Sequence, residues 1–501
     1  MSYISYLCKC MKNHFSLFII SFCLPFVLWA ACGIMPTFDD YTSLQSTWWV
    51  QIADPGYFFA DVVRRPFDAL LGAIVGWQPA LFPTLNHVLI ILGHTASAWL
   101  VYALCQRLLV GDASKRCSSS AAVCDASKRC TQATLAANIA TLFFFFSPAT
   151  LGATLACDGF NQTYAQLWGL LSLWLYLRGK RFWLACVVMA VLSKENGLAW
   201  AVVPPIVGYA FGKVGGRQAL RHIGYGLAVA LVYFIVYFAI YKSGVLHIEY
   251  DEQYTEVTLA DHLKDFIQLM GYTWIPLDYM SIVYAPTRNL LFAAITLLLS
   301  LPFLLLLAVK WRLLGSRQLL LLIACFFILV SPHLVTVVSI MHNYAALSMA
   351  AFVIACIVSS MTGRKHIATA FALFMAAALF TDAHHYLAAR QSGLLGQKLA
   401  HQAINVHATP PAHVFCINID DPDEPRYSSF VVRPVDAFAW GLSVRHFSHY
   451  SWKTHIDEIS LPQYDQKQVE ALADSALRSG SEAVWVVGHK ADSITILTAP
   501  Q

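Results

Sequence analysis

Residues Phe15–Met35, FSLFIISFCLPFVLWAACGIM, are soon followed by Phe38-Asp39-Asp40-Tyr41-Thr42-Ser43. The apolar run is long enough to cross a bilayer, and it is too long and too poorly terminated for a cleaved signal peptide. We therefore predict a retained first membrane span. Two adjacent carboxylates at the mouth of a membrane helix cost free energy unless they pair, bind a cation or stay wet. We hypothesise that Asp39 and Asp40 form the acid/base centre of a membrane enzyme; the alternative is that they cap the next helix.

The composition is that of a membrane protein. The chain has 501 residues, of which 58% are hydrophobic and 12% are charged. A soluble domain carries about twice that charged share. The net charge of +4 gives no indication of nucleic-acid binding, and the 13 cysteines show no repeated CxxC spacing that would predict a zinc site.

The apolar runs predict about eleven membrane spans. The predicted spans are Phe15–Met35, Leu85–Leu109, Thr134–Leu155, Tyr164–Leu177, Phe182–Leu192, Leu198–Phe211, Leu220–Tyr241, Leu290–Val309, Leu319–Val338, Tyr344–Met361 and Ile367–Thr381. Every alternate loop between them is rich in Lys and Arg, whereas the opposite loops are acidic. The positive-inside rule therefore predicts a cytoplasmic N-terminus and an extracytoplasmic C-terminus.

The C-terminal tail has a different pattern from the rest of the chain. Short apolar stretches that suit strands alternate there with a helical pattern, which is typical of a small α/β domain. We predict a transmembrane domain at residues 1–383 and an α/β domain on the outer face at residues 384–501. The expected elements are strands at residues 414–420, 483–488 and 493–498 and a helix at residues 466–477.

Further polar residues fall mostly at the predicted outer face. They are Arg64, Arg65, His87, His94, Asp158, Lys194, Glu195, His342 and Asn343. Carboxylates and cations gathered at one membrane face can hold an anionic lipid headgroup and activate an acceptor. Simpler roles stay open: non-selective lipid contact for Arg64 and Arg65, and a mutual ion pair for Lys194 and Glu195. His87 and His94 are core histidines in this alternative, Asp158 is a helix cap, and His342 is a loop residue without a role.

An ordered set of motifs resembles the membrane-embedded GT-C glycosyltransferases, and is similar to the branch of dolichyl-phosphate-mannose protein O-mannosyltransferases and related bacterial enzymes. The residues that carry the resemblance are Asp39-Asp40, Arg65-Pro66, Asn86-His87, Ser147-Pro148, Asp158 and Leu192-Ser193-Lys194-Glu195. It covers roughly residues Phe15 to Gly212. The chain departs from the family at His342-Asn343-Tyr344, where members often carry Glu-Arg-Tyr, so no role of a late-loop arginine transfers.

The resemblance implies a GT-C-like fold and sugar transfer from a polyprenyl-phosphate donor to a glycan, lipid or protein acceptor at the extracytoplasmic face. Asp39 or Asp40 would take the acceptor proton, with inversion at the sugar carbon, and we favour Asp39. Arg65 and Lys194 would bind the donor phosphate. The acidic pair leaves open a role for Mg²⁺ or Mn²⁺, and no other cofactor is implied. The expected location is a bacterial inner membrane, with membrane lipid as the surrounding partner.

Three other functions compete with this interpretation. An O-antigen polymerase or ligase uses similar donors, but the early acidic pair and the acidic loop before the eighth span argue against it. A transporter or flippase often repeats its hydropathy between halves, and this chain does not. A non-catalytic scaffold that displays the tail domain requires the acidic pair to be dispensable.

Overall fold

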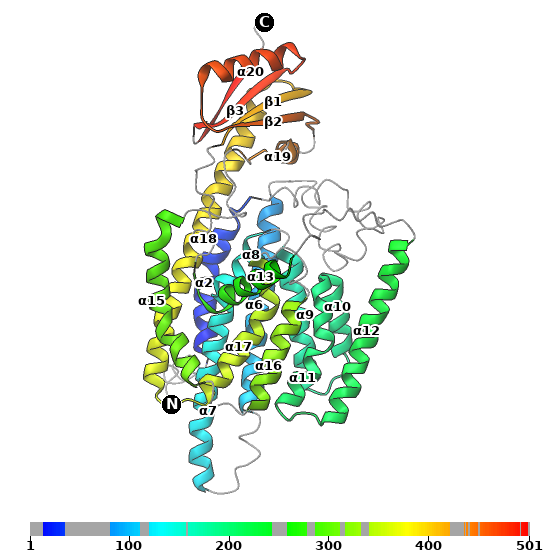
Figure 1. The fold of residues 1–501 in the computed structure, drawn as a ribbon, viewed down its shortest axis with the longest axis vertical. Helices are drawn as coiled ribbons and strands as arrows, with labels where there is room; N and C mark the ends of the chain where they lie inside the picture. Colours follow the sequence, from blue (N-terminus) through cyan, green and yellow to red (C-terminus); the bar gives the residue numbers. More distant parts are fainter. Residues whose placement is uncertain are drawn as a thin grey trace, which may run out of the picture.

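The computed structural model is a bundle of helices with a small β-sheet beyond one end (Figure 1). It describes residues 14–35, 81–110, 120–156, 159–242, 258–277, 286–310, 316–331, 340–420, 435, 437–438, 441–448, 451–490 and 492–498. The sheet lies at one end of the long axis of the molecule, and the start of α7 (Ser120–Phe145) lies at the other.

Helices make up nearly all of the described bundle. In chain order they are α2 (Phe15–Ala31), α6 (Leu81–Val110), α7 (Ser120–Phe145), η2 (Pro148–Thr150), α8 (Leu151–Leu155), α9 (Gly159–Leu177), α10 (Trp183–Ser193), η3 (Glu195–Ala201), α11 (Val203–Ala210), α12 (Gly216–Lys242), α13 (Leu259–Trp274), α15 (Pro286–Lys310), α16 (Ser316–Val330), η7 (Ile340–Asn343), α17 (Tyr344–Ser359) and α18 (Arg364–Val406). Every predicted apolar run overlaps one of these helices. The apolar runs therefore located the helices correctly.

The number of full spans is lower than the sequence predicts. Five described helices are long and apolar enough to cross a membrane, or six if the bent pair Cys130–Phe145 and Pro148–Leu155 is counted as one span. This falls short of the predicted eleven. The main reason is length: α2, α10 and α16 are apolar but have only 17, 11 and 15 residues, whereas a straight span needs about 20.

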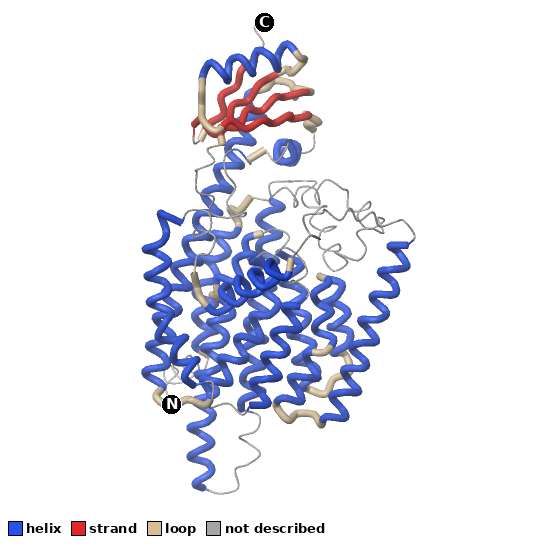
Figure 2. Tube along the Cα trace, viewed as in Figure 1, coloured by secondary structure: helices blue, strands red, loops and turns tan. Residues whose placement is uncertain are grey.

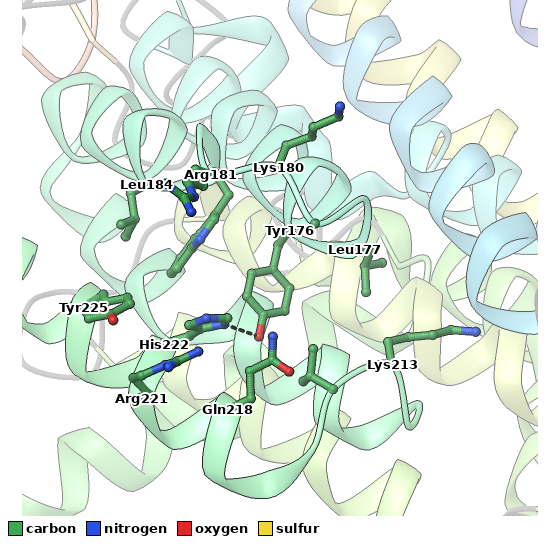
Figure 3. A pocket seen from close by; sticks show the side chains of 13 residues that line it. Tyr176, Leu177, Lys180, Arg181, Leu184, Lys213, Gln218, Arg221, His222 and Tyr225 are labelled. Carbon is green, nitrogen blue, oxygen red and sulfur yellow. Dashed lines mark hydrogen bonds between the residues drawn. The ribbon is translucent and has the colours of Figure 1, made fainter.

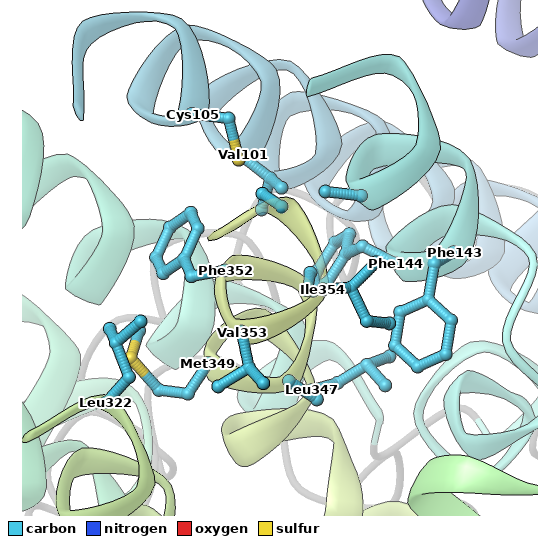
Figure 4. Close-up of a cluster of buried hydrophobic side chains, with 14 of the residues drawn as sticks. Val101, Cys105, Phe143, Phe144, Leu322, Leu347, Met349, Phe352, Val353 and Ile354 are labelled. Atoms are coloured by element: carbon cyan, nitrogen blue, oxygen red, sulfur yellow. The ribbon is translucent and has the colours of Figure 1, made fainter. Parts of the chain in front are cut away.

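Helix α17 is the centre of the bundle. Its side chains from Tyr344 to Val358 are all buried, and helices α6, α7, α9, α15 and α16 pack around it. Figure 4 shows Leu347, Met349 and Phe352 of α17 among side chains of these neighbours. Five of its residues are alanine, and small residues let neighbouring backbones approach closely inside a membrane.

Helix α13 falls in a region that the sequence predicts only as an acidic outer loop. It begins with a capping box, in which the Thr258 hydroxyl accepts from the Asp261 backbone N–H and the Asp261 carboxylate accepts from the Thr258 backbone N–H. This arrangement satisfies two of the N–H groups that a helix start leaves without a partner. Helix α13 then packs against η7 and α17.

The C-terminal sheet has four strands, seen in red in Figure 2. The strands are β1 (His413–Ile419), β2 (His455–Leu461), β3 (Ala483–Lys490) and β4 (Ser493–Thr498), in the spatial order β2-β1-β3-β4. Strand β1 is parallel to β2 and β3, while β4 is antiparallel to β3. The sequence predicted β1, β3, β4 and the helix α20 (Gln466–Arg478), but not β2 or the short helix α19 (Leu442–Phe447).

This domain has three layers. On one face of the sheet, Val484 and Val486 of β3 pack with Val469 and Ala473 of α20. On the other face, Trp485 and Val487 pack with the last turns of α18. Alternate residues of a strand point to opposite faces, so a single strand supplies both cores.

Helix α18 joins the bundle to the sheet. It continues without a break from Arg364 to Val406, so the predicted domain boundary at residues 383 and 384 lies inside one helix. Close to the sheet, Ala400 of α18 packs with Met35 and Phe447. The C-terminal domain therefore sits on an extension of a bundle helix.

Two glycines of α12 provide a test of the bundle packing. A Cβ at Gly226 would overlap the backbone carbonyl of Ala201, whereas a Cβ at Gly224 would meet nothing. We expect Gly226→Ala to lower the thermal stability of the purified protein, because overpacking costs about 1–3 kcal/mol. Gly224→Ala should leave stability unchanged or slightly higher. Equal melting temperatures for the two variants would contradict the described packing of α12 against η3.

Candidate functional site

The structure describes six of the predicted site residues. His87 and His94 lie on α6, Lys194 lies between α10 and η3, Glu195 opens η3, and His342 and Asn343 lie in η7. Asp39, Asp40, Arg64, Arg65 and Asp158 lie outside the described residues. The candidate site is therefore built here from its described part, at the end of the bundle that faces the sheet.

Helix α10 ends early and is followed directly by a charged pair. With 11 residues it is about 16 Å long, which is roughly half the thickness of the hydrocarbon layer. Helix α12, which lies beside it, has 27 residues and extends much further (Figure 1). At the end of α10, Lys194 takes an extended conformation, with φ −159° and ψ 142°, and the chain turns into η3. Lys194 and Glu195 therefore follow a helix that stops short of the end that α12 reaches.

The Lys194–Glu195 ion pair is only partly shielded. Lys194 Nζ lies 3.3 Å from Glu195 Oε1, and the two side chains are 32% and 55% exposed. An ion pair this accessible contributes about 0–1 kcal/mol, so Glu195 can be exchanged for another anion at little cost. His342 of η7 lies within electrostatic range of both. These three residues are called the charged cluster, and its two charges are those of Lys194 and Glu195.

The two histidines of α6 join helices together. His87 Nε2 lies 3.0 Å from the Leu155 carbonyl oxygen. His94 Nε2 lies 3.0 Å from the Phe145 carbonyl oxygen, and its Nδ1 lies 2.8 Å from the Tyr344 hydroxyl. A carbonyl can only accept, so Nε2 of His94 carries the proton and Nδ1 accepts from Tyr344. His94 therefore holds α6, the end of α7 and the start of α17 together.

Asn343 has a similar role on the other side of the site. It is fully buried, and its Nδ2 donates to the Leu269 carbonyl of α13 at 3.1 Å. This bond fixes η7, and with it His342, against α13. The short elements η2 and α8 pack on η7 as well. The two neighbouring residues that the sequence predicted therefore differ in role: His342 lies near the Lys194–Glu195 ion pair, and Asn343 holds η7 against α13.

Buried amides that the sequence analysis missed lie next to the charged cluster. Asn196 Nδ2 donates to Gln162 Oε1 of α9 at 2.8 Å. Gln162 and Gln166 are 3% and 1% exposed, and within the described part of the chain the Gln166 amide makes no hydrogen bond. Polar side chains inside a membrane bundle usually mark an interior that works on a substrate or ion. Their signal in the sequence is a group of amides within the otherwise apolar run of α9.

A second buried polar group lies in a small cavity between α2, α6 and α18. The cavity has a volume of about 90 Å³ and is mostly apolar, with Asp382, Tyr386 and His94 in its wall. Asp382 is 8% exposed, and among the described residues its Oδ1 has no partner. The sequence analysis did not select Asp382, because it is a single acidic residue at the end of a predicted span.

The C-terminal domain carries one cluster with metal-binding donors. His413, His455 and Asp457 lie at the start of the paired strands β1 and β2, and their ligand atoms are all within 4.8 Å of one another. In the described structure they bind each other: Asp457 accepts from His413 Nε2 at 2.7 Å and from His455 Nε2 at 3.1 Å. Two imidazoles and a carboxylate suit a transition metal better than Mg²⁺.

Comparison with known proteins gave no match. No family model matches the chain, and neither a curated protein nor a solved structure is significantly similar to it.

The bond between Tyr344 and His94 gives a stability prediction. Tyr344→Phe removes the donor to a buried ring nitrogen, which should cost about 1–3 kcal/mol. We therefore expect a lower melting temperature for the purified variant in detergent. Tyr225→Phe, at a position that is 49% exposed, is the matched control and should melt with the parent. If the parent and both variants melted at the same temperature, the hydrogen bond between Tyr344 and His94 would not stabilise the fold.

Asp457 gives a pH-dependent prediction. The hydrogen bond from His413 is the main cause that holds the pKa of the Asp457 carboxyl below its ordinary value of 3.8. Because this pKa is lower in the folded state, the ionised carboxylate stabilises the fold above pH 3.8, and that contribution is lost as the pH falls through the lower value. Asp457→Asn should therefore weaken the pairing of β1 with β2 at pH 6, but not at about pH 2.

Hydrogen exchange of the full-length protein measures this effect. Peptides that cover β1 and β2 should exchange faster in Asp457→Asn than in the parent at pH 6, and the difference should disappear at the acidic pH. Asp474→Asn, on the exposed side of α20, should match the parent throughout. A difference that persists unchanged at the acidic pH would show that the amide acts through packing and not through charge.

Proposed function

We propose that this chain is a membrane glycosyltransferase that moves a sugar from a polyprenyl-phosphate donor to an acceptor at the extracytoplasmic face. The observation that carries the proposal is the charged cluster of Lys194, Glu195 and His342, placed where α10 stops. A half-exposed ion pair within a membrane bundle needs a wet or polar recess. The proposal includes a cytoplasmic N-terminus, an extracytoplasmic C-terminus, a bacterial inner membrane and the full predicted set of about eleven helices.

The broken helices near the cluster support this assignment. Backbone that is not α-helical is tolerated at membrane depth only where protein buries it or where it lines a water-filled cavity. Three short 3₁₀ segments, η2, η3 and η7, interrupt the helices around the cluster. The residues of η2 and most of those of η3 are buried. Protein therefore buries this irregular backbone, and Thr150 and Asn196 hydrogen-bond within the bundle.

The chemistry follows from the charges. Asp39, or Asp40, takes the proton from the acceptor hydroxyl as its oxygen bonds to the anomeric carbon, which inverts. The bond between that carbon and the phosphate oxygen breaks, and polyprenyl phosphate leaves with the electron pair. Lys194 and Arg65 neutralise the charge that grows on the leaving phosphate. Mg²⁺ or Mn²⁺ at the acidic pair would serve the same purpose. The acceptor is a glycan, lipid or protein hydroxyl.

A second candidate function is transport. Asp382 favours it, because a carboxyl group in an apolar cavity inside a bundle is the kind of group that carries protons or ions across membranes. The two functions separate in one variant: Asp382→Asn should abolish proton-coupled transport, whereas a transferase centred on Lys194 should keep its turnover.

Turnover with a polyprenyl-phosphate sugar tests the transferase. Asp39→Asn and Asp40→Asn keep the side-chain shape but cannot take a proton, so at least one should lose about 10²–10⁴-fold in turnover. Lys194→Gln should instead weaken use of the donor, seen as a raised KM. Each variant is purified and compared with the parent at equal amounts of folded protein. Lys365→Gln, a charge change at the opposite end of the bundle, is the control.

The simpler interpretation of the acidic pair predicts a different result. If the carboxylates only cap a helix, Asn serves about as well as Asp, and turnover per folded molecule should not change. Full activity in the double variant Asp39→Asn with Asp40→Asn would refute the proposed mechanism. An unchanged donor KM in Lys194→Gln would remove the charged cluster from the donor site.

A further inference from the structure

A large basic cavity lies at the other end of the bundle, away from the sheet. It has a volume of about 670 Å³ and is formed where α9 passes into α10 and where α11 passes into α12. Figure 3 shows four cationic side chains around it: Lys180, Arg181, Lys213 and Arg221. The charge pattern of the loops assigns this end of the bundle to the cytoplasm.

The same type of turn builds both sides of the cavity. Helix α9 ends at Leu177 and is closed by Gly179, whose φ of 69° is left-handed; the next residue, Lys180, donates its backbone N–H to the Leu175 carbonyl at 3.0 Å. Helix α11 ends in the same way: Gly212 has φ 65°, and Lys213 donates to the Gly208 carbonyl at 2.8 Å. Both are Schellman motifs. Each turn therefore places a lysine directly after a helix end, at the cavity.

Three aromatic side chains hold the walls together. The hydroxyl of Tyr176 on α9 and Nδ1 of His222 on α12 lie 2.9 Å apart, which is the dashed line in Figure 3. Trp183 of α10 packs its edge against Tyr176, with ring centroids 5.2 Å apart. These contacts join α9, α10 and α12 across the cavity. Side-chain contacts between three helices therefore form the inner wall of the cavity.

The charge of the cavity is unbalanced. Of the side chains that line it in the described structure, four are cationic and none is acidic. Cations at helix C-termini are favourable by themselves, which accounts for Lys180 and Lys213 singly. It does not account for Arg221, which lies in the second turn of α12 and not at a helix C-terminus. Guanidinium groups bind phosphate oxygens through two parallel hydrogen bonds.

Apolar surface beside the cavity distinguishes a lipid from a free anion. Phe182, between Arg181 and the buried Trp183, is 76% exposed. Tyr225, Val232 and Val236 of α12 are 49%, 60% and 39% exposed, and their spacing of seven and four residues places them along the side of the helix that lines the cavity. This apolar stripe starts at Tyr225, which lines the cavity, and continues along α12 toward its C-terminal end. Acyl chains can lie along it while a headgroup occupies the cavity.

We propose that this cavity binds the phosphate headgroup of an anionic phospholipid from the leaflet at the basic end of the bundle. Basic pockets between helices at this membrane face are suited to such headgroups. Arg181 and Arg221 bind the phosphate, Lys180 and Lys213 provide the surrounding positive field, and the stripe on α12 holds the chains.

Native mass spectrometry of the full-length protein in detergent tests the proposal. The probes are dioleoylphosphatidylglycerol, dioleoylphosphatidylcholine and inorganic pyrophosphate. The parent should bind the anionic lipid more tightly than the zwitterionic one. Each cation near a membrane surface contributes roughly fivefold to the affinity, so Arg181→Gln with Arg221→Gln should lose about 30-fold for the phosphatidylglycerol. Arg181→Lys with Arg221→Lys keeps the charge and should lose less.

The matched control is Lys310→Gln with Lys365→Gln. It removes two charges at the same end of the bundle, from the exposed ends of α15 and α18, and should bind as the parent does. If the double arginine variant aggregates, Arg221→Gln alone should show the fivefold loss. If Lys310→Gln with Lys365→Gln lost as much affinity for the phosphatidylglycerol as Arg181→Gln with Arg221→Gln, the effect would be one of general surface charge, and the proposal would be overturned. Pyrophosphate binding as tight as that of the lipid would overturn the assignment to a lipid.

Discussion

The enclosure of α17 by other helices is the constraint on which the rest of the bundle depends. Within its most apolar window, 89% of the residues are buried, so its first turn begins inside protein and not in water. Polar side chains at such a position need partners from the protein itself. The surrounding helices supply them through His94 at Tyr344 and through the bond from Asn343 to α13. The interruptions of neighbouring helices gather at this same level, which is why polar side chains collect there.

Apolar runs predicted the helices well and their ends poorly. Hydropathy falls after Thr381, which marks where the chain leaves the apolar layer, but α18 continues to Val406 because leaving a membrane does not end a helix. The alternation of residues predicted β1, β3 and β4. It missed β2, whose apolar residues Ile456, Ile459 and Leu461 do not alternate, as expected for an edge strand with partly exposed faces. The number of full-length spans among the described residues is lower than predicted, because each apolar run was taken to form a helix long enough to cross a membrane.

Some residues of the candidate site could be predicted from the sequence, and others could not. Lys194 and Glu195 are neighbours in the sequence, and the alternation of basic loops was enough to predict His342 on the same side as they are. Gln162 and Asp382 were missed, since a single polar residue in an apolar run is informative only when the rotation of its helix is known. The pairing of His413 with Asp457 spans 44 positions and depends on the parallel register of two strands, one of which was not predicted.

Helix α18 gives the molecule a mechanical property. Its 43 residues form a rod about 65 Å long, with the membrane bundle around its first half and the sheet packed on its last turns. A tilt of about 5° at Asp382 would move the end of the helix at Val406, about 36 Å away, by roughly 3 Å. The sheet therefore behaves as the end of a lever whose pivot lies beside Asp382 and Tyr386. A force on the C-terminal domain would therefore tilt α18 inside the bundle. Conversely, a small change in the packing around Asp382 would produce a larger displacement of the sheet.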